Sequence, residues 1–354
     1  MIGREKRKRM KKSMLAAQLV RYNARLEIRP VGVPKPRGEN VLVKIAGAGL
    51  CHSDLYLIDG KNKIATDFPL TLGHENAGHV EAVGEDVTSF KTGDPVVVFG
   101  GWSSSPNRFT LAGEEQLGDR SGWAGIGKPG GFAEYLLVPN HRYLVPIGNV
   151  DPVEAATLAD CGLTSYRAIR KIAPRVTAGD HVVLIGIGGI GLYGVQYCKL
   201  LCQSRVIAVD IDDSKLKLAK EFGAEFVINS KKENVGERIN AITSGEGAFG
   251  VIDFVGSDET LDLAYRVAAK RAKVVIVGLG GGTLRYETKH RMNEIEVTTS
   301  LWGSMPELKS VVEIARLGLT RARVLKIGFE EINEAFQRMS NGQSTGRTVL
   351  VPNP

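Results

Sequence analysis

The pattern of hydrophobic and polar positions divides the chain into two unlike parts. From His181 onward, short β-branched runs alternate with segments of helical spacing. We expect strands at 181–185, 205–209, 226–228, 251–254 and 273–277, and helices from the glycines after residue 185 to about 202 and at 213–222, 235–242 and 259–268. This alternation predicts βαβ units and a doubly wound parallel sheet covered by helices on both faces.

The first 160 residues show little helical periodicity. Short strands are expected at 41–46, 79–83, 95–99 and 133–138, separated by Gly- and Pro-rich turns. This favours an all-β or irregular α+β domain. The Gly-, Ser- and Pro-rich stretch 100–131 is predicted to be a long surface loop. Helices are expected at 306–317 and 332–339, and the final strand, at 348–351, is predicted to return to the first domain.

The length of 354 residues exceeds the size at which a single core keeps growing, so two domains are expected. The sequence contains no apolar run close to the roughly 20 residues that a membrane-spanning helix requires. The first residues also lack the hydrophobic segment of a signal peptide. We therefore expect a cytoplasmic protein with no membrane partner.

The formal net charge of +7 is concentrated at the N-terminus. Residues 1–12 carry seven basic side chains against Glu5, which accounts for +6 of the total. A terminal run of like charges is typical of a disordered arm. Because the rest of the chain is nearly neutral, nucleic acid is not the expected partner.

The four cysteines are too few to form a disulfide scaffold in a chain of this length. A reducing compartment fits this number. Cys198 and Cys202 lie four residues apart in a predicted helix, and we interpret both as buried, inert thiols.

A glycine-rich segment follows the first predicted strand of the second half. It reads Gly186-Ile187-Gly188-Gly189-Ile190-Gly191 and opens a predicted helix. In this context the pattern is typical of a dinucleotide-binding loop. The first glycine would allow a tight turn, the second would let the backbone approach a pyrophosphate, and the third would let helix and strand pack closely. The helix N-terminus would offer free N–H groups to the phosphates.

Asp210 ends the next predicted strand, 19 residues after Gly191. A carboxylate at this place accepts hydrogen bonds from the ribose hydroxyls of NAD and repels the 2′-phosphate of NADP. NAD is therefore the favoured cofactor, with use of both cofactors as the alternative. The competing interpretation, a helix N-cap, suits Asp212 or Asp213 better.

Two short clusters of candidate metal ligands precede the glycine loop. Cys51 offers a thiolate and His74 an imidazole nitrogen, and both are typical zinc ligands. Asp54 is a candidate to fix the tautomer of the imidazole, and Glu75 lies where it could reach the metal as water leaves. Each residue alone could instead be an ordinary buried side chain. An electrophilic metal beside a hydride-accepting cofactor indicates alcohol and carbonyl redox chemistry.

From about Met14 onward, the chain resembles the zinc-dependent medium-chain alcohol dehydrogenases. The resemblance is carried by Gly49-Leu50-Cys51-His52-Ser53-Asp54, Gly73-His74-Glu75-Asn76-Ala77-Gly78, Asp160-Cys161-Gly162-Leu163-Thr164-Ser165-Tyr166, the glycine loop and Gly346-Arg347. It implies a GroES-like, mainly β catalytic domain and an α/β Rossmann domain. The implied boundaries are 14–163 with 304–354 for the catalytic domain and 164–303 for the Rossmann domain, after a basic arm at 1–13.

The resemblance also implies a third zinc ligand just before the Rossmann domain. Most members have a cysteine six residues before the tyrosine of that motif, where this chain has Asp160. Some members use aspartate in a similar context, and a carboxylate oxygen is a sound zinc donor. We therefore expect Asp160, with Cys161 as the alternative, and Glu75 as an occasional fourth ligand.

Many members hold a second, structural zinc on four cysteines in the part that matches residues 100–131. This chain has no cysteine between Cys51 and Cys161, which excludes such a site. One catalytic zinc per subunit is expected. The segment 100–131 must then be held by packing alone or be mobile.

Roles around hydride transfer follow from the same resemblance. Ser53 would take the hydroxyl proton of the alcohol. Tyr56 stands where several relatives have histidine, so the onward route would run through water or His52. The implied cofactor contacts are His52 and Arg347 at the pyrophosphate, Lys215 at the ribose and Thr164 at the nicotinamide.

Trp302 matches an aromatic residue that lines the substrate pocket of some relatives. Apolar walls favour hydrophobic primary or secondary alcohols and their aldehydes or ketones. The nearest rival is a polyol or sugar dehydrogenase, although these usually carry Glu-Pro where this chain has Ala159-Asp160. A rival of another class is a non-catalytic nucleotide- or RNA-binding protein, suggested only by the basic arm. Relatives imply a homodimer or homotetramer.

Overall fold

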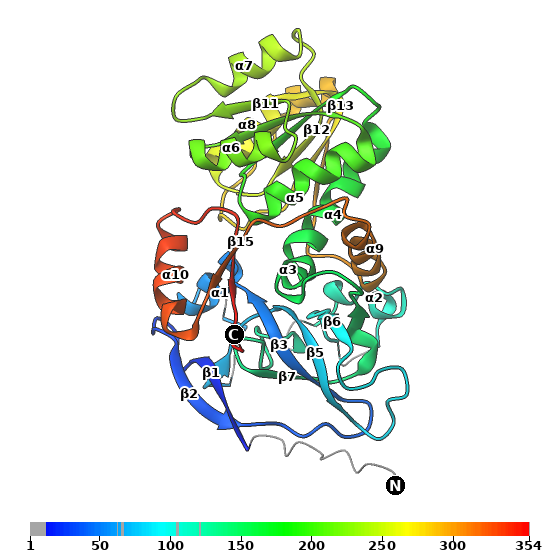
Figure 1. The fold of residues 1–354 in the computed structure, drawn as a ribbon. Helices are drawn as coiled ribbons and strands as arrows, with labels where there is room; N and C mark the ends of the chain where they lie inside the picture. Colours follow the sequence, from blue (N-terminus) through cyan, green and yellow to red (C-terminus); the bar gives the residue numbers. More distant parts are fainter. Residues whose placement is uncertain (1–11, 62, 65–66, 104–105, 120–121, 354) are drawn as a thin grey trace.

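The computed structural model describes residues 12–61, 63–64, 67–103, 106–119 and 122–353. The basic arm expected at 1–13 lies outside these residues except for its last two, and Ser13 already begins a strand. Figure 1 shows two bodies, a lower one that contains both the first strands and the C-terminus, and an upper one formed by the middle of the chain.

The lower body is built on two sheets. One runs in the order β15-β16-β3-β5-β6-β8, with β7 also paired to β3, and the other in the order β2-β1-β4. Their strands are β1 (Ser13–Leu19), β2 (Glu27–Gly32), β3 (Val41–Gly49), β4 (Leu70–Thr71), β5 (Glu75–Val83), β6 (Pro95–Val98), β7 (Tyr135–Val138), β8 (Leu144–Pro146), β15 (Val324–Ile327) and β16 (Arg347–Leu350). The predicted return of the last strand is confirmed, because Leu350 of β16 pairs with Ala48 of β3.

The upper body contains a six-stranded parallel sheet in the order β11-β10-β9-β12-β13-β14. Its strands are β9 (His181–Ile185), β10 (Arg205–Asp210), β11 (Phe226–Asn229), β12 (Ala248–Asp253), β13 (Ala268–Ile276) and β14 (Glu296–Thr299). The strand order reverses direction next to β9, and ligands bind at such a switch point in open α/β sheets.

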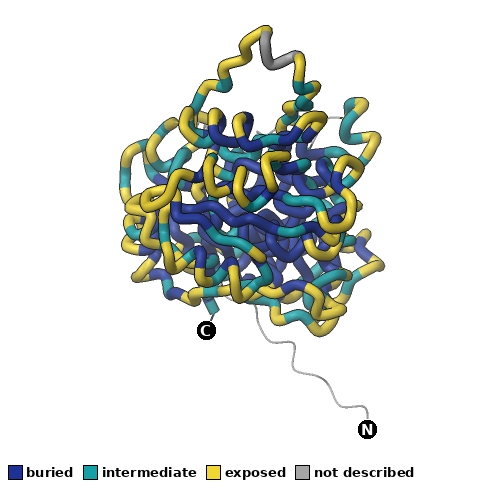
Figure 2. The backbone as a smooth tube through the Cα atoms, turned by 90° about the horizontal axis from the view of Figure 1, so that it is seen from above, coloured by how far each residue is buried: buried dark blue, intermediate teal, exposed yellow. Residues whose placement is uncertain are grey.

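Alternate residues of β9 explain why this sheet is covered on both faces. Val182 and Leu184 belong to the main hydrophobic core, whereas Val183 and Ile185 pack in a second cluster. Successive side chains of a strand point to opposite faces, so both faces are buried. Figure 2 shows the buried backbone gathered in the interior of the molecule. The predicted doubly wound sheet is confirmed.

The helices connect these strands and join the two bodies. They are α1 (His52–Ile58), α2 (Arg108–Leu111), α3 (Pro152–Ala155), α4 (Cys161–Ile172), α5 (Gly189–Tyr197), α6 (Asp213–Glu221), α7 (Val235–Ile242), α8 (Asp258–Arg266), α9 (Met305–Arg316) and α10 (Ile332–Ser340). A π-helical turn at Cys198–Cys202 continues α5. Among the described residues, no helix has the length and apolar character needed to cross a membrane.

Helix α4 is an element that the sequence pattern did not predict. Nine of its twelve residues are buried, and the other three, Arg167, Arg170 and Lys171, have the spacing of one helical face. The buried face includes Gly162, Thr164 and Ser165, which interrupt its apolar pattern. Strand β2 was also missed, because five of its six residues are exposed and show no alternation.

The segment 100–131 is not the open surface loop predicted above. It contains α2 and a 3₁₀ turn at Glu115–Leu117, and it buries Trp102 and Trp123. Asn107 caps α2 by accepting hydrogen bonds from the backbone N–H groups of Phe109 and Thr110. The segment is therefore folded onto the core by tryptophan burial and local capping.

Candidate active site

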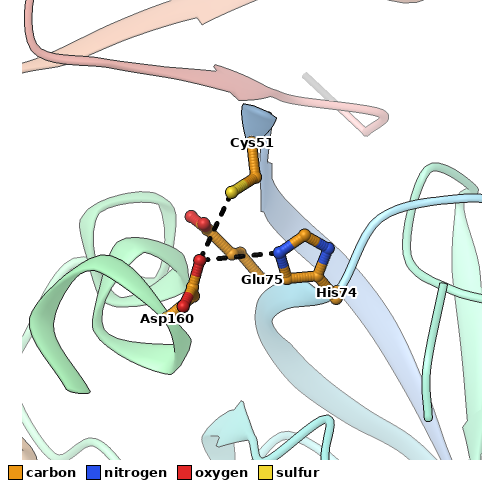
Figure 3. A group of neighbouring side chains, drawn as sticks. All are labelled: Cys51, His74, Glu75 and Asp160. Carbon is orange, nitrogen blue, oxygen red and sulfur yellow. Dashed lines mark hydrogen bonds and ion pairs between the residues drawn. The ribbon is translucent and has the colours of Figure 1, made fainter. Parts of the chain in front are cut away.

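Three side chains from separate elements converge between the two bodies. Cys51 lies between β3 and α1, His74 directly precedes β5, and Asp160 separates a 3₁₀ turn (Ala156–Ala159) from α4. With Glu75 they form a buried group whose potential ligand atoms all lie within 4.8 Å of one another. Figure 3 shows the four side chains pointing toward a common centre.

The Asp160 carboxylate is the centre of this group. Its Oδ2 atom lies 3.4 Å from Cys51 Sγ and 3.5 Å from His74 Nε2. Its other oxygen, Oδ1, accepts a hydrogen bond of 2.6 Å from the hydroxyl of Thr164. One carboxylate oxygen is thus held by Thr164 while the other faces the thiol and the imidazole.

Asp54 interacts with both Cys51 and His74. Its Oδ1 atom lies 3.2 Å from His74 Nδ1, so that His74 Nε2 faces the donor group. Its Oδ2 atom accepts a hydrogen bond of 2.9 Å from the backbone N–H of Cys51. The carboxylate is fully buried. A second carboxylate behind a ligand histidine is the usual device for orienting it on a metal.

Burial and neighbouring charges act in opposite directions on the pKa values of these donors. Burial raises the pKa of the Cys51 thiol, but the positive charges of Arg347 and His74 outweigh burial and lower it. Burial also disfavours ionised Asp160, yet hydrogen bonding and charge from His74 leave its pKa lowered. Burial opposes protonation of His74, and the charge of Asp54 raises its pKa. The lowered pKa values of the Cys51 thiol and the Asp160 carboxyl favour the deprotonated forms that bind metal.

Glu75 faces the same centre but is already paired. Its Oε2 atom accepts a hydrogen bond of 3.0 Å from Arg347 Nε, and its Oε1 atom is bound by a terminal nitrogen of the same guanidinium. Arg347 also lies 3.6 Å from Asp160 Oδ2. Glycine at position 49 makes this possible, because a Cβ there would meet Glu75 Oε2 at 2.1 Å.

The donor set fits one divalent cation. A thiolate, an imidazole nitrogen and a carboxylate oxygen, all buried and mutually close, are a zinc ligand set that keeps a fourth position open. Glu75 and Asp160 both lie beside the guanidinium of Arg347, and a deprotonated Cys51 would add a third negative charge to this group. An added cation would offset the remaining negative charge.

Cys161 lies outside the group, although it is adjacent to Asp160 in sequence. Its thiol packs toward the other body, 3.0 Å from where a Cβ on Gly189 would stand. Burial raises its pKa well above the ordinary value. Of the two alternatives left open above, the geometry places only Asp160 beside Cys51 and His74.

The glycine loop joins β9 to α5 at the switch point of the parallel sheet. Gly186 has a φ of +89°, which favours glycine in the tight turn. Around Gly188, a Cβ would meet no atom within 4 Å, so the backbone is open to a ligand. A Cβ on Gly191 would lie 2.2 Å from the Gly186 carbonyl, which requires glycine there. Ile190 is half-buried beside the loop.

Asp210 holds this loop in place. Its Oδ2 atom accepts a hydrogen bond of 2.7 Å from the Ile187 backbone N–H, and its Oδ1 atom accepts one of 3.0 Å from that of Asp212. Each carboxylate oxygen has a further lone pair for a ribose hydroxyl. Asp212 is the N-cap of α6, in agreement with the separate roles expected for these two residues.

Lys215 and Arg347 carry positive charge beside the loop, next to His52. Partial removal of water, followed by the charges of Arg347 and Lys215, lowers the pKa of His52 to about 4. The three side chains are therefore close enough to influence one another. Arg347 and Gly189 also line one small cavity. Positive side chains beside a helix N-terminus suit a pyrophosphate.

Ser53 and Tyr56 lie on α1, next to the metal group. The Ser53 hydroxyl is 3.7 Å from Cys51 Sγ, and both Ser53 and Tyr56 are half-buried. Burial and the charge of Cys51 raise the pKa of the Tyr56 phenol. Tyr56 therefore keeps its proton at neutral pH. The ammonium of Lys61 lies 5.7 Å from the centre of its ring.

An aromatic wall stands on the other side of His74. The Trp302 ring meets the His74 ring edge to face, at a centroid distance of 5.8 Å. Phe99 stacks on Trp302 at 6.0 Å, and Trp123 contacts it at 4.7 Å. The metal group thus contacts both the charged side chain of Arg347 and an aromatic cluster packed against His74.

Sequence reasoning missed three contacts in this site. The hydrogen bond from Thr164 to Asp160 had a signal, since residues four apart share one face of a helix. The ion pair of Glu75 with Arg347 joins residues 272 positions apart, and no local sequence pattern indicates it. The hydrogen bond from Trp302 to the Ala159 carbonyl joins residues 143 positions apart, and no local pattern indicates it either.

A buried thiolate–imidazole–carboxylate group beside a dinucleotide-binding Rossmann sheet defines the class of metal-dependent, nucleotide-dependent oxidoreductases. Two family models match: the alcohol dehydrogenase GroES-like domain over residues 37–149 and the zinc-binding dehydrogenase over residues 189–316. The chain belongs to the zinc-dependent medium-chain alcohol dehydrogenase family.

Named relatives cover nearly the whole chain. An NAD-dependent alcohol dehydrogenase of Sulfurisphaera tokodaii is 37% identical over 96% of this chain and 100% of its own. A D-arabinose 1-dehydrogenase (NADP(+)) of Saccharolobus solfataricus is 34% identical over 95% of this chain and 97% of its own. The crystal structure of the alcohol dehydrogenase of Aeropyrum pernix has a TM-score of 0.90 and 36% identity, over 96% of this chain and 100% of that one.

Proposed function

We propose that the protein is a zinc- and NAD-dependent alcohol dehydrogenase. It interconverts hydrophobic primary or secondary alcohols with their aldehydes or ketones. The observation that carries the proposal is the position of one residue, Arg347, which binds Glu75 at the metal group and packs against Gly189 of the dinucleotide loop. Metal chemistry and cofactor chemistry therefore meet at one place.

We propose Cys51, His74 and Asp160 as the zinc ligands. When bound, zinc supplies a Lewis acid that lowers the pKa of an alcohol hydroxyl, and NAD supplies the acceptor for hydride. Asp54 and Thr164 orient the ligands through the hydrogen bonds described above. Glu75 remains a candidate for occasional coordination, which would require it to leave Arg347.

Proton removal is proposed to begin at Ser53, whose hydroxyl lies at the edge of the metal group. Tyr56 does not accept the proton, because its phenol is already protonated at neutral pH. The onward route then runs through water or His52, which is exposed to solvent next to Ser53. A surface-exposed imidazole can pass a proton to bulk water.

The cofactor is proposed to be NAD(H), held by the loop from Gly186 to Gly191 with Asp210 at the ribose. Lys215 and Arg347 supply positive charge for the ribose side and the pyrophosphate, and His52 is proposed as a further, uncharged contact at the pyrophosphate. Thr164 is proposed to contact the nicotinamide, and its hydroxyl also donates a hydrogen bond to Asp160. The carboxylate of Asp210 disfavours the 2′-phosphate of NADP.

The substrate class follows from the aromatic wall. Trp302, Phe99 and Trp123 are all buried and lie on the His74 side of the metal group. Such walls favour apolar alcohols over polyols. A sugar dehydrogenase is the second candidate, because one relative at 34% identity is named D-arabinose 1-dehydrogenase (NADP(+)).

A homodimer or homotetramer is proposed from the edge of the parallel sheet. Strand β14 pairs only with β13 within the described residues, and Val297 on β14 and Met292 before it are exposed. An exposed sheet edge with apolar side chains favours pairing with a second chain.

We keep the proposed domain boundaries at 14–163 with 304–354 and at 164–303. A cytoplasmic location is proposed from the four free cysteines.

The direct test is a panel of alcohols and ketones assayed with NAD(H) and with NADP(H). Turnover of hydrophobic alcohols with NAD and of their ketones with NADH is expected, with lower kcat/KM for pentoses. Faster turnover of arabinose with NADP would favour the sugar dehydrogenase.

Deletion of residues 1–12 should leave turnover unchanged. Loss of nucleic-acid binding on this deletion, with no turnover in either form, would favour the non-catalytic alternative.

A further inference from the structure

The Asp160 backbone lies at a break between two helices. The 3₁₀ turn at Ala156–Ala159 ends just before it and α4 begins just after it. Its φ and ψ are −133° and −63°, outside the helical region. Helix α4 holds this residue on one side, because the Asp160 carbonyl accepts a hydrogen bond of 2.7 Å from the Thr164 backbone N–H. The backbone on the side of the 3₁₀ turn requires another anchor.

Trp302 provides that anchor. Its indole N–H donates a hydrogen bond of 2.6 Å to the carbonyl of Ala159. The peptide unit that joins Ala159 to Asp160 is planar and rigid, so a bond to this carbonyl also fixes the position of the Asp160 Cα atom. A buried indole N–H usually has such a partner, and here the partner directly precedes a proposed ligand.

The same side chain supports a second proposed ligand. The rings of Trp302 and His74 meet at 78°, with centroids 5.8 Å apart. This edge-to-face geometry is favourable for aromatic pairs and limits rotation of the imidazole. Asp54 holds His74 from the Nδ1 side. His74 is thus restrained on one side by a carboxylate and on another by the indole.

Trp302 is itself rigidly held. It is only 5% exposed, and its backbone has a φ of +45°, which non-glycine residues rarely adopt. Phe99 and Trp123 pack against its ring. A strained conformation persists only where the surroundings fix it, and such positions concentrate at functional sites.

From these contacts we infer that Trp302 is a positioning residue of the metal centre, which holds Asp160 through the Ala159 carbonyl and His74 through ring contact. This role differs from lining a substrate pocket, because it acts on the ligands and needs no substrate. It rests on the zinc centre of the proposed function. Outer partners of metal ligands typically contribute about 10–100-fold to metal affinity.

The test measures zinc release from the full-length protein without NAD or substrate. Wild type, Trp302→Phe and Trp102→Phe are loaded with zinc and mixed with excess chelator and a metal-indicator dye. Trp102 is the matched control, since it is similarly buried and its indole nitrogen has no hydrogen-bond partner among the described residues. Trp302→Phe should release zinc at least about tenfold faster than wild type, and Trp102→Phe at the wild-type rate.

Equal release rates for the two variants, whether fast or slow, would overturn the inference. A wild-type protein that binds no zinc would instead refute the metal centre of the proposed function, so the two failures are distinguishable. Thermal unfolding of the metal-free proteins establishes that both variants fold.

A second measurement uses the wild type and does not depend on the folding of Trp302→Phe. The chain has three tryptophans and therefore gives three indole N–H signals by NMR. Trp102→Phe and Trp123→Phe assign two of them, and the third belongs to Trp302. That signal should exchange slowly with water and shift when zinc is removed. A third signal unchanged by zinc removal would contradict the inference.

Discussion

Arg347 and Glu75 form a buried ion pair beside the proposed zinc ligands, although 272 residues separate them in the sequence. Glu75 begins β5 and Arg347 begins β16, which lie on either side of β3. The exposed fractions of their side chains are 8% for Arg347 and 0% for Glu75. The C-terminal strand thus brings to the active site the cation that offsets a buried carboxylate.

This pair predicts an asymmetric effect on stability. Arg347→Met leaves Glu75 buried without its cation, and breaking a buried pair in this way typically costs about 3–5 kcal/mol. The double variant Glu75→Gln/Arg347→Met removes both charges and should recover much of that loss. Urea unfolding in the presence of a chelator measures each value. A double variant no more stable than Arg347→Met would contradict the expectation.

The third ligand is tested by two substitutions of neighbouring residues. Asp160→Asn keeps the shape of the side chain and removes its charge, so zinc should be lost on dialysis. The loss of activity should exceed the roughly hundredfold effect typical of an outer partner. Cys161→Ser should retain zinc, because the Cys161 thiol faces Gly189. The zinc content of each dialysed variant is measured by metal analysis. Loss of zinc from Cys161→Ser and its retention in Asp160→Asn would mean that Cys161, and not Asp160, is the third ligand.

Glu307 gives a prediction for the dependence of stability on pH. Burial disfavours its charge, but the Ser304 backbone N–H and Arg167 outweigh burial and lower its pKa below the ordinary 4.5. Between the lowered pKa and 4.5, the unfolded chain binds more protons than the folded one. The contribution of Glu307 is therefore present above pH 4.5 and lost as pH falls through the lowered pKa.

Glu307→Gln removes this contribution. The difference in Tm between wild type and Glu307→Gln should be largest above pH 4.5 and shrink as the solution is acidified. Glu313, on an exposed face of the same helix, is a matched control, and Glu313→Gln should show a smaller difference. If the difference in Tm between wild type and Glu307→Gln does not change with pH, this explanation is ruled out.

Asp210 should control the choice between the two nicotinamide cofactors. Asp210→Asn retains an oxygen that accepts the hydrogen bond from Ile187 and removes the charge that repels a 2′-phosphate. The ratio of kcat/KM for NADP to that for NAD should rise at least about tenfold, which corresponds to about 1.4 kcal/mol. An unchanged ratio would mean that another residue selects the cofactor. Thermal unfolding checks that the loop keeps its fold.

The sequence predicted the parts of the fold that have a periodic signal. Strand β9, the glycine loop and β10 combine a continuous apolar run, a defined glycine spacing and an acidic residue at a fixed distance, and all of these are local features. In helix α4 the signal is weakened, because the buried face includes Gly162, Thr164 and Ser165, which interrupt its apolar pattern. Its position nevertheless determines where Asp160 lies.

The site was predictable where its residues cluster in the sequence, as in Cys51 to Asp54 and His74 to Glu75. Identifying Asp160 required the family resemblance, since nothing local distinguishes a ligand aspartate from a neighbouring cysteine. The support from Trp302 depends on a hydrogen bond between residues 143 positions apart. Contacts of this kind are set by tertiary packing, which single-sequence patterns do not encode.

The segment 100–131 has a practical consequence for work with this protein. It is held by buried tryptophans, the Asn107 cap and the hydrogen bond from Arg167 to Glu114, none of which involves a metal or a thiol. Removal of zinc with a chelator should therefore abolish the catalytic activity while leaving this segment folded. Cobalt or cadmium can then be added to the metal-free protein, where each should bind at the one proposed metal site.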